Sequence, residues 1–232
     1  MDNLALITWS HTSYSDIWPL YFGQLEKHFN NMPKSYVFLE SESSELSDNH
    51  IALTNCETDP YYKRFLDCLD NIEEEYVLYS QEDHIFYKDI NTQRIQDFID
   101  ILDKNNQFSF IRLIKSGELG GIKWDTDLYV IPRSSTYLFS LQSAIWRKED
   151  LRKLYMYFRP YQFRDAENYG SLAMSAMSQE GLYCYNNEPQ RGSLHFDSDV
   201  VPYVATAVNK GKWNLKQYRS ELMPLFEQYD ID

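Results

Sequence analysis

The sequence predicts an α/β fold, in which a central, mostly parallel sheet is flanked by helices and the second half of the chain is mixed. Short apolar runs alternate with helical patterns through the first half, and the third run ends abruptly in two adjacent carboxylates, Glu82 and Asp83. Such alternation is typical of a sheet covered by helices on both faces. The 232 residues include only eight glycines and eight prolines, which form no linker. We therefore expect one domain over residues 1–232, whose halves, 1–115 and 116–232, differ in pattern.

The first strand and helix are predicted from the residues that open the chain. The apolar run at 4–9 predicts a central strand, and a polar loop follows it. Asp16 is placed to cap the next helix, and Pro19 falls in the first turn of that helix, where its missing N–H does no harm. Residues 35–39 are the second apolar run and predict the second strand.

The middle of the chain continues the alternation. A polar tract at 41–49 predicts a surface loop, and apolar residues at helical spacing over 61–72 predict an amphipathic helix. The aromatic run that begins at Glu75 predicts a buried strand, because about five consecutive apolar residues are typical of parallel-sheet strands. A helix over 95–102 and a strand over 108–114 complete the first half.

The second half is less regular. We expect strands at 128–131 and 137–146 and helices at 148–157, 166–179 and 215–229. Asp165 is placed to cap the helix at 166–179, and Gly181 lies just past its end. Pro224 should kink or divide the last helix, because proline removes a helical hydrogen bond.

Composition excludes several classes of protein. The formal charge is −13, with 35 acidic against 22 basic residues, so binding to a nucleic-acid backbone is disfavoured. The three cysteines, Cys56, Cys68 and Cys184, lack metal-ligand spacing and indicate reduced thiols in a cytoplasmic setting. No apolar run reaches the roughly 20 residues that a transmembrane helix needs. We expect a cytoplasmic protein without a transmembrane segment.

The two carboxylates after the third strand are the first candidate site. The carboxyl ends of parallel strands are where α/β proteins place their ligands. Carboxylates there need a cation, a donor or water, and Mg²⁺ or Mn²⁺ bound to phosphate oxygens would satisfy them. The alternative is that Glu82 and Asp83 simply begin a solvated loop. His84 follows at once, and strand alternation predicts that it points away from Asp83.

Four short motifs in series resemble the GT-A glycosyltransferases, and more narrowly the small sugar-transferring enzymes encoded by large algal viruses and their bacterial relatives. The motifs are YVLYSQED at 76–83, QSAIWRK at 142–148, the pair Ala166-Glu167, and KGKWN at 210–214. The first is similar to the strand that leads into the acidic triplet of that family. The resemblance implies a GT-A, Rossmann-like fold with a nucleotide-sugar half followed by an acceptor half.

The resemblance also implies roles for single residues. Asp83 would bind Mn²⁺ or Mg²⁺ directly, and Glu82 would act through water or the ribose. Gln81 stands where the family more usually has an acid, so one carboxylate is missing. His195 would complete the metal shell. Glu167 would be the base that takes a proton from the acceptor hydroxyl in an inverting reaction, with Asp165 as the second choice; an acid in a first helical turn can also serve only the helix dipole.

Contacts to the donor are expected on the early loops and near the end of the chain. The residues after the first strand would seat the base and ribose, and Glu40 ends the second strand, where it could hold ribose hydroxyls. Three cationic side chains could neutralise the diphosphate. These candidates are Thr8, Trp9, Ser10, Glu40, Arg64, Lys210 and Lys212.

The preferred function is a metal-dependent glycosyltransferase that moves a sugar from a UDP-, GDP- or dTDP-sugar to a glycan hydroxyl. One alternative is a sugar-nucleotide pyrophosphorylase, which would want a glycine-rich loop after the first strand; residues 4–14 contain no glycine. Another is a non-catalytic nucleotide- or sugar-binding protein on the same scaffold, which the missing acid at Gln81 would favour.

Overall fold

The computed structural model describes residues 1–115, 121–186, 190–191, 195–209 and 211–231, with the side chains of Arg191 and His195 left aside. Its main sheet has nine strands in the order β3-β2-β1-β4-β9-β6-β10-β8-β7. The strands are β1 (Leu4–Trp9), β2 (Lys34–Leu39), β3 (His50–Thr54), β4 (Tyr76–Gln81), β6 (Phe108–Arg112), β7 (Ile122–Lys123), β8 (Leu128–Val130), β9 (Ala144–Arg147) and β10 (Glu180–Cys184).

Most strands of this sheet run in the same direction, whereas β9 and β8 run against their neighbours. Strands β3, β2, β1 and β4 pair in parallel, as do β6 and β10. Strand β9 lies antiparallel between β4 and β6 and joins the two groups. Three small antiparallel pairs accompany the sheet: β5 (His84–Phe86) with β13 (Tyr203–Ala205), β11 (Gln190–Arg191) with β12 (His195–Phe196), and β14 (Val208–Asn209) with β15 (Lys212–Trp213). The predicted α/β class with a mostly parallel sheet is confirmed.

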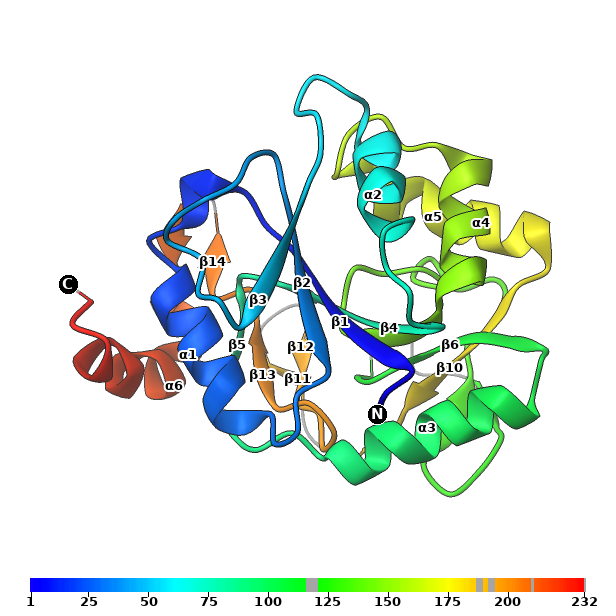
Figure 1. Cartoon of the computed structure of the whole chain (residues 1–232). Helices are drawn as coiled ribbons and strands as arrows, with labels where there is room; N and C mark the ends of the chain where they lie inside the picture. Colours follow the sequence, from blue (N-terminus) through cyan, green and yellow to red (C-terminus); the bar gives the residue numbers. More distant parts are fainter. Residues whose placement is uncertain (116–120, 187–189, 192–194, 210, 232) are drawn as a thin grey trace.

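Helices cover both faces of the sheet, as Figure 1 shows. One face carries α1 (Trp18–His28), α3 (Thr92–Lys104) and α6 (Leu215–Gln228). The other carries α2 (Tyr61–Leu69), α4 (Lys148–Phe158) and α5 (Asp165–Met177). Among the described residues, no helix is long and apolar enough to cross a membrane.

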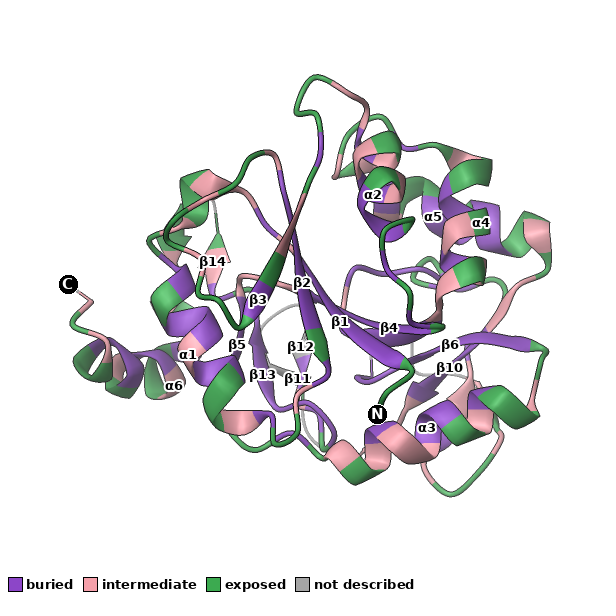
Figure 2. Cartoon of the chain, in the orientation of Figure 1, coloured by how far each residue is buried: buried purple, intermediate pink, exposed green. Residues whose placement is uncertain are grey.

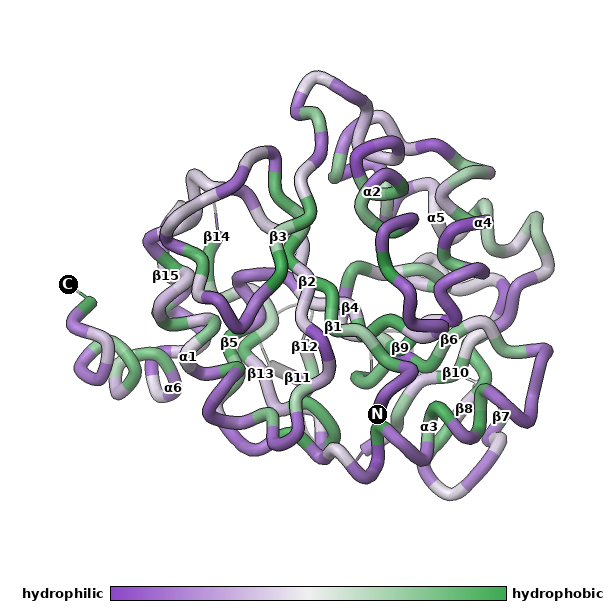
Figure 3. Tube along the Cα trace, viewed as in Figure 1, coloured by the Kyte–Doolittle hydropathy of each residue, from purple (hydrophilic) through white to green (hydrophobic). Residues whose placement is uncertain are grey.

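The central strands are buried on both faces, which explains their unbroken apolar runs (Figure 2). In β1, Leu4 and Leu6 pack toward α1 and α3, whereas Ala5 and Ile7 pack toward α2 and α4. Figure 3 shows that hydrophobic residues concentrate in the central strands, whereas hydrophilic residues are frequent in the outer loops. Each central strand therefore contributes to two separate apolar layers.

The first helix begins differently from the prediction. Pro19 does lie in its first turn, but Asp16 does not cap it: the N-cap is Ile17, without a side-chain cap. A 3₁₀ turn at Thr12–Tyr14 runs into the helix, and backbone carbonyls of that turn region accept the first N–H groups. A carboxylate cap is therefore not needed.

Three expectations for the second half need correction. The strand expected at 137–146 is confined to Ala144–Arg147, because side chains rather than a neighbouring strand bind the backbone at 137–141. Asp165 is the first residue of α5 rather than its cap, and Ser178 ends that helix in the left-handed conformation. Gly181 lies inside β10, where a Cβ atom would come within 2.0 Å of the Phe110 ring.

The last helix bends, but not at its proline. Pro224 lies inside α6, and the residue with non-helical angles is Tyr218, at φ −126° and ψ 28°. The main element that sequence analysis missed is β3, an edge strand in which only His50 is buried. Its weak apolar pattern follows from this one-sided exposure.

Candidate functional site

The site lies where β1 and β4 end side by side. Trp9, the last residue of β1, pairs with Gln81, the last residue of β4. From β1 the sheet continues through β2 and β3 on one side and through β4 on the other, so ligands are expected in the crevice at these strand ends. A pocket opens there. It is lined by Trp9, Ser10, His11, Tyr14, Ile17, Gln81, Glu82, Asp83, Phe163, Val208 and Gly211.

Glu82 and Asp83 form the tight turn between β4 and β5 in the wall of this pocket. Burial raises the pKa of Glu82 to about 8, and the neighbouring Asp83 charge adds to that rise. Burial likewise raises the pKa of Asp83 to about 7, although its side chain remains 22% exposed. Two carboxylates are therefore held with little water around them, which favours protonation or the approach of a cation.

His84 does not point away from the acids as alternation predicted. Because β4 ends at Gln81 and a new strand begins at His84, the alternation is interrupted at the turn. The His84 Nε2 atom lies 4.0 Å from the Asp83 Oδ1 atom, and Nδ1 lies 3.4 Å from the Ser143 hydroxyl. Among the described side chains, this imidazole is the one base that pairs with either carboxylate.

No described group of three or more His, Cys, Asp or Glu side chains is arranged to hold a metal ion. The described part of the chain therefore offers two carboxylates at this point rather than a complete set of ligands. Mg²⁺ is commonly held in this way, by one or two carboxylates together with water and substrate phosphates. The carboxylates of Glu82 and Asp83 fit a hard divalent ion whose remaining ligands would be water and oxygen atoms of the substrate.

Gln81 and Glu167 meet through the backbone of Leu141. The Gln81 Nε2 atom donates to the Leu141 carbonyl at 3.0 Å, and the Leu141 N–H donates to Glu167 Oε1 at 2.8 Å. Glu167, in the first turn of α5, is half-buried and does not line the pocket itself. Leu141 thus links the candidate base Glu167 to Gln81, the last residue of the strand that leads into the acidic turn.

The segment before β9 is held closely on α5. The Ser171 hydroxyl donates to the carbonyl of Thr136 and accepts the N–H of Phe139. A Cβ atom at Gly170 would come within 2.5 Å of the Phe139 ring, so glycine permits this close approach. Asp165 serves its own helix, since its carboxylate accepts the N–H of Gln162.

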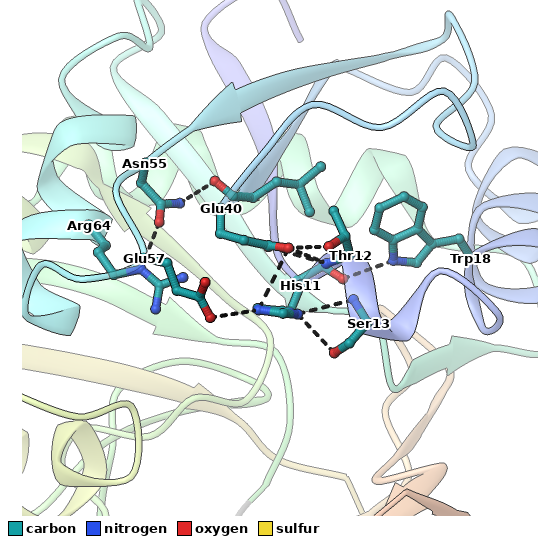
Figure 4. A network of polar contacts seen from close by, with 10 residues as sticks. His11, Thr12, Ser13, Trp18, Glu40, Asn55, Glu57 and Arg64 are labelled. Carbon is teal, nitrogen blue, oxygen red and sulfur yellow. Dashed lines mark hydrogen bonds and ion pairs between the residues drawn. The ribbon is translucent and has the colours of Figure 1, made fainter.

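Glu40 holds the loop after β1, as Figure 4 shows. Its carboxylate accepts the backbone N–H and the hydroxyl of Thr12, and it lies 3.6 Å from His11 Nε2. Burial alone would raise the pKa of Glu40, but the Thr12 donors, the backbone N–H of Glu40 and the nearby His11 together leave the pKa lowered. His11 also pairs with Glu57 at 3.3 Å. The Glu40 carboxylate is therefore bound to the loop after β1 and is not free to make the expected contact with a ribose.

A second pocket adjoins the first and shares Trp9, Ser10, His11 and Phe163 with it. Arg64 lines this second pocket, and its Nε donates to Asn55 Oδ1 at 2.7 Å (Figure 4). Its guanidinium carbon lies 5.2 Å from the Trp9 ring centre. The Phe163 ring stacks on Trp9 with 6.4 Å between centroids. An arginine with one edge fixed and an aromatic surface beside it suit a planar, electron-rich ligand.

Phe163, which lines both pockets, is among the residues that sequence analysis missed. It comes from the α4–α5 connection, which is held against α2 because the N–H groups of Tyr61 and Tyr62 donate to the carbonyls of Tyr161 and Pro160. Nothing in the residues near Phe163 signals this long-range pairing.

The remaining candidates lie apart from these contacts or outside the described part. Thr8 is fully buried and its hydroxyl lies 2.9 Å from that of Tyr21, facing α1 rather than the pocket. Lys212 is exposed on the β14–β15 hairpin, whose Val208 and Gly211 line the first pocket. Lys210 lies outside the described residues, as does the side chain of His195, whose backbone forms β12.

No family model matches the chain, and no curated protein does. Solved structures match it by fold alone. TarS from S. aureus is 16% identical with a TM-score of 0.55 over 100% of this chain, and residues 1–349 of TarS in complex with UDP are 16% identical with a TM-score of 0.53 over 88%. A cytidylyltransferase from Leptospira borgpetersenii is 10% identical with a TM-score of 0.52 over 100% of this chain and 97% of that one.

The fold is therefore GT-A-like and Rossmann-type, a fold that nucleotide-using transferases have. This chain spans only 39% and 60% of the two TarS structures. The expected fold class is confirmed, and the likeness to these structures is one of fold.

Proposed function

We propose that this protein is a metal-dependent glycosyltransferase that uses a nucleoside-diphosphate sugar. The observation that carries the proposal is a pair of desolvated carboxylates, Glu82 and Asp83. They lie in the wall of a pocket where β1 and β4 end side by side. The UDP bound to a structural neighbour is in keeping with it.

The two pockets suit different parts of such a donor. The diphosphate would lie in the first pocket, where Asp83 and Glu82 would hold Mn²⁺ or Mg²⁺ against it. The nucleoside would extend past Trp9 and Phe163 toward Arg64 in the second pocket. When bound, the ion would stabilise the negative charge that grows on the leaving diphosphate.

The acceptor chemistry falls to Glu167. An acceptor hydroxyl is a poor nucleophile until a base takes its proton. Glu167 is bound through one oxygen to the Leu141 N–H, and this bond holds the carboxylate on the residue that Gln81 also binds. It would take the proton as the sugar is transferred with inversion to a glycan hydroxyl. Lys212, on the exposed hairpin, would help to neutralise the diphosphate.

The test is a thermal-shift series with UDP, GDP and dTDP, each with and without Mn²⁺. One nucleotide together with Mn²⁺ should raise the melting temperature more than either alone, by linkage. Asp83→Ala should lose this joint effect, while Asp48→Ala, a change at an exposed acid of the 41–49 loop, should keep it. Equal shifts for wild type and Asp83→Ala would remove the metal site from the proposal.

A panel of nucleotide sugars tests turnover directly. Slow release of free sugar from one donor would identify the nucleotide and sugar without knowledge of the acceptor. A donor that binds with Mn²⁺ but releases no sugar, with or without glycan hydroxyls added, would favour the non-catalytic binding protein.

A nucleotidyltransferase is the second candidate, because the Leptospira cytidylyltransferase matches this chain over nearly its whole length. Against it, the loop after β1 lacks glycine, and its Thr12 N–H is already bound by the Glu40 carboxylate. A triphosphate would meet that negative charge. Release of pyrophosphate from CTP or another nucleoside triphosphate and a sugar phosphate would support this second candidate over the first.

A further inference from the structure

A small cavity lies beneath the site, between β4, α4 and the segment before β9. It is lined by Phe65, Tyr79, Phe139, Ser140, Leu141, Trp146, Leu151 and Tyr155. The volume open to the centre of a water molecule is about 10 Å³. That is the smallest space that holds one water, and a water also needs at least two polar partners.

Two hydroxyl groups on the cavity wall are buried without a well-formed hydrogen bond. Tyr79 and Ser140 are 4% and 7% exposed, and neither hydroxyl meets the distance and angle of a hydrogen bond with a described residue, although the Tyr61 hydroxyl lies close enough to that of Tyr79 to interact with it. A buried hydroxyl left unpaired is costly, so such groups are normally satisfied by protein or by ordered water. Burial raises the pKa of Tyr79 well above its ordinary value, so its phenol stays protonated and can both donate and accept.

We infer that one ordered water occupies this cavity, bridges the hydroxyls of Tyr79 and Ser140, and thereby positions the segment that holds Glu167. Both hydroxyls belong to chain segments that also carry residues of the site. Tyr79 lies on β4 two residues before Gln81, and Ser140 directly precedes Leu141. The water would join these two chain segments from below, while the Gln81 side chain joins them from the pocket side.

This arrangement makes Tyr79 and Ser140 positioning residues. Neither lines the first pocket, and both act on Glu167 through the Leu141 backbone. The catalytic consequence rests on the proposed function, whereas the water itself does not. The experiments are therefore chosen to separate the two.

The decisive measurement for the water is a crystal structure at high resolution. We expect one density peak within hydrogen-bond distance of both hydroxyls in the wild type, and its loss when Tyr79→Phe and Ser140→Ala are combined. A dry cavity in the wild type would overturn the inference.

Thermal unfolding gives an independent sign. If the water is present, Tyr79→Phe and Ser140→Ala each break one of its hydrogen bonds and should lower the melting temperature by about 2–4 °C. The melting temperature of the double variant should fall by less than the sum of the two single effects, because both variants disturb the same water. If the cavity is dry, removing an unpaired buried hydroxyl should leave stability unchanged or raise it.

Ser35→Ala is the matched control, because Ser35 is buried, binds His50 and lies outside the cavity lining. Its effect should add to that of Tyr79→Phe. Full additivity of Tyr79→Phe with Ser140→Ala as well would contradict a shared water.

The positioning role has its own readouts. In crystals of Ser140→Ala, the distance between Leu141 N and Glu167 Oε1 should lengthen from 2.8 Å. With an active donor in hand, kcat should fall several-fold while the KM for the donor stays near the wild-type value. An unchanged distance and unchanged kcat would remove the positioning role and leave the water as purely structural.

Discussion

Gln81 and Glu167 bind opposite backbone groups of the same residue, Leu141, at 3.0 and 2.8 Å. The amide of Gln81 is the donor to the carbonyl, and a carboxylate cannot donate. This explains why glutamine stands where the resemblance leads one to expect an acid: here the position joins β4 to the segment before β9.

Restoring the acid at this position should therefore harm the protein. Gln81→Glu would place a negative oxygen against the Leu141 carbonyl and lose a donor, so the free energy of unfolding should fall by about 1–3 kcal/mol at pH 7. Urea unfolding measures this change. At pH 4, where the introduced acid is largely protonated and can donate again, the difference from wild type should shrink.

Glu167→Gln should separate catalysis from structure. The amide oxygen can still accept the Leu141 N–H, so the melting temperature should change little. Loss of a general base should lower kcat by about 10²–10⁴-fold. Asp165 lies two residues earlier in the same first turn, and its carboxylate accepts the N–H of Gln162, so Asp165→Asn should retain most of the kcat. The reverse ranking would make Asp165 the base.

Asp83→Asn should trade activity for stability. Loss of the electrostatic help of a bound ion should lower turnover by about 10²–10³-fold. The same change removes a buried charge from metal-free protein, so at pH 8.5 the free energy of unfolding should rise by about 1 kcal/mol.

The pH dependence of that gain follows from the sign of the shift. The pKa of Asp83 is raised to about 7 in the folded protein, so its contribution to stability is present at low pH and is lost as the pH rises through 7. The advantage of Asp83→Asn should therefore be smallest at pH 4, grow steadily as the pH rises, and reach its full size at about pH 7. An equal advantage at both values would argue that the carboxylate is not desolvated.

Arg64→Lys tests the second pocket. Lysine keeps the charge but loses the planar group that Asn55 orients beside Trp9, so nucleotide affinity should fall about tenfold. Titration calorimetry with the preferred nucleoside diphosphate and Mn²⁺ measures the effect. Arg219→Lys, on the exposed side of α6, is the control and should bind like wild type.

His50 should make the protein sensitive to acid. Burial lowers its pKa, against the opposing influence of Glu26. A histidine with a lowered folded pKa takes up its proton more readily when unfolded, so stability should fall as the pH drops below about 6.5 and level off below the folded pKa. Urea unfolding between pH 7.5 and 5 should show a shallower loss for His50→Gln than for wild type.

Several elements of the fold were predicted correctly from the local sequence pattern. The strand at Leu4–Trp9, the proline in the first turn of α1 and the end of β4 at Gln81 all follow from apolar runs and turn chemistry. The acidic turn could be located for the same reason, since parallel strands end at one edge of the sheet.

The parts that sequence reasoning missed depend on long-range contacts. The direction of His84 depends on β5 pairing with β13, more than a hundred residues later. Phe163 reaches the pocket only because carbonyls of its loop meet the N-terminus of α2. Glu40 follows the second strand as expected, but its carboxylate accepts the N–H of Thr12. No local pattern predicts this hydrogen bond.

Strand β9 runs against its neighbours β4 and β6, so the segment that enters it arrives at the same rim as the ends of β1 and β4. A parallel strand in that position would deliver this segment to the opposite rim. One reversed strand thus lets the later half of the chain supply groups to a crevice built by the earlier half. Insertions ahead of Ala144 could then remodel what the crevice receives while the strands that frame Asp83 keep their register.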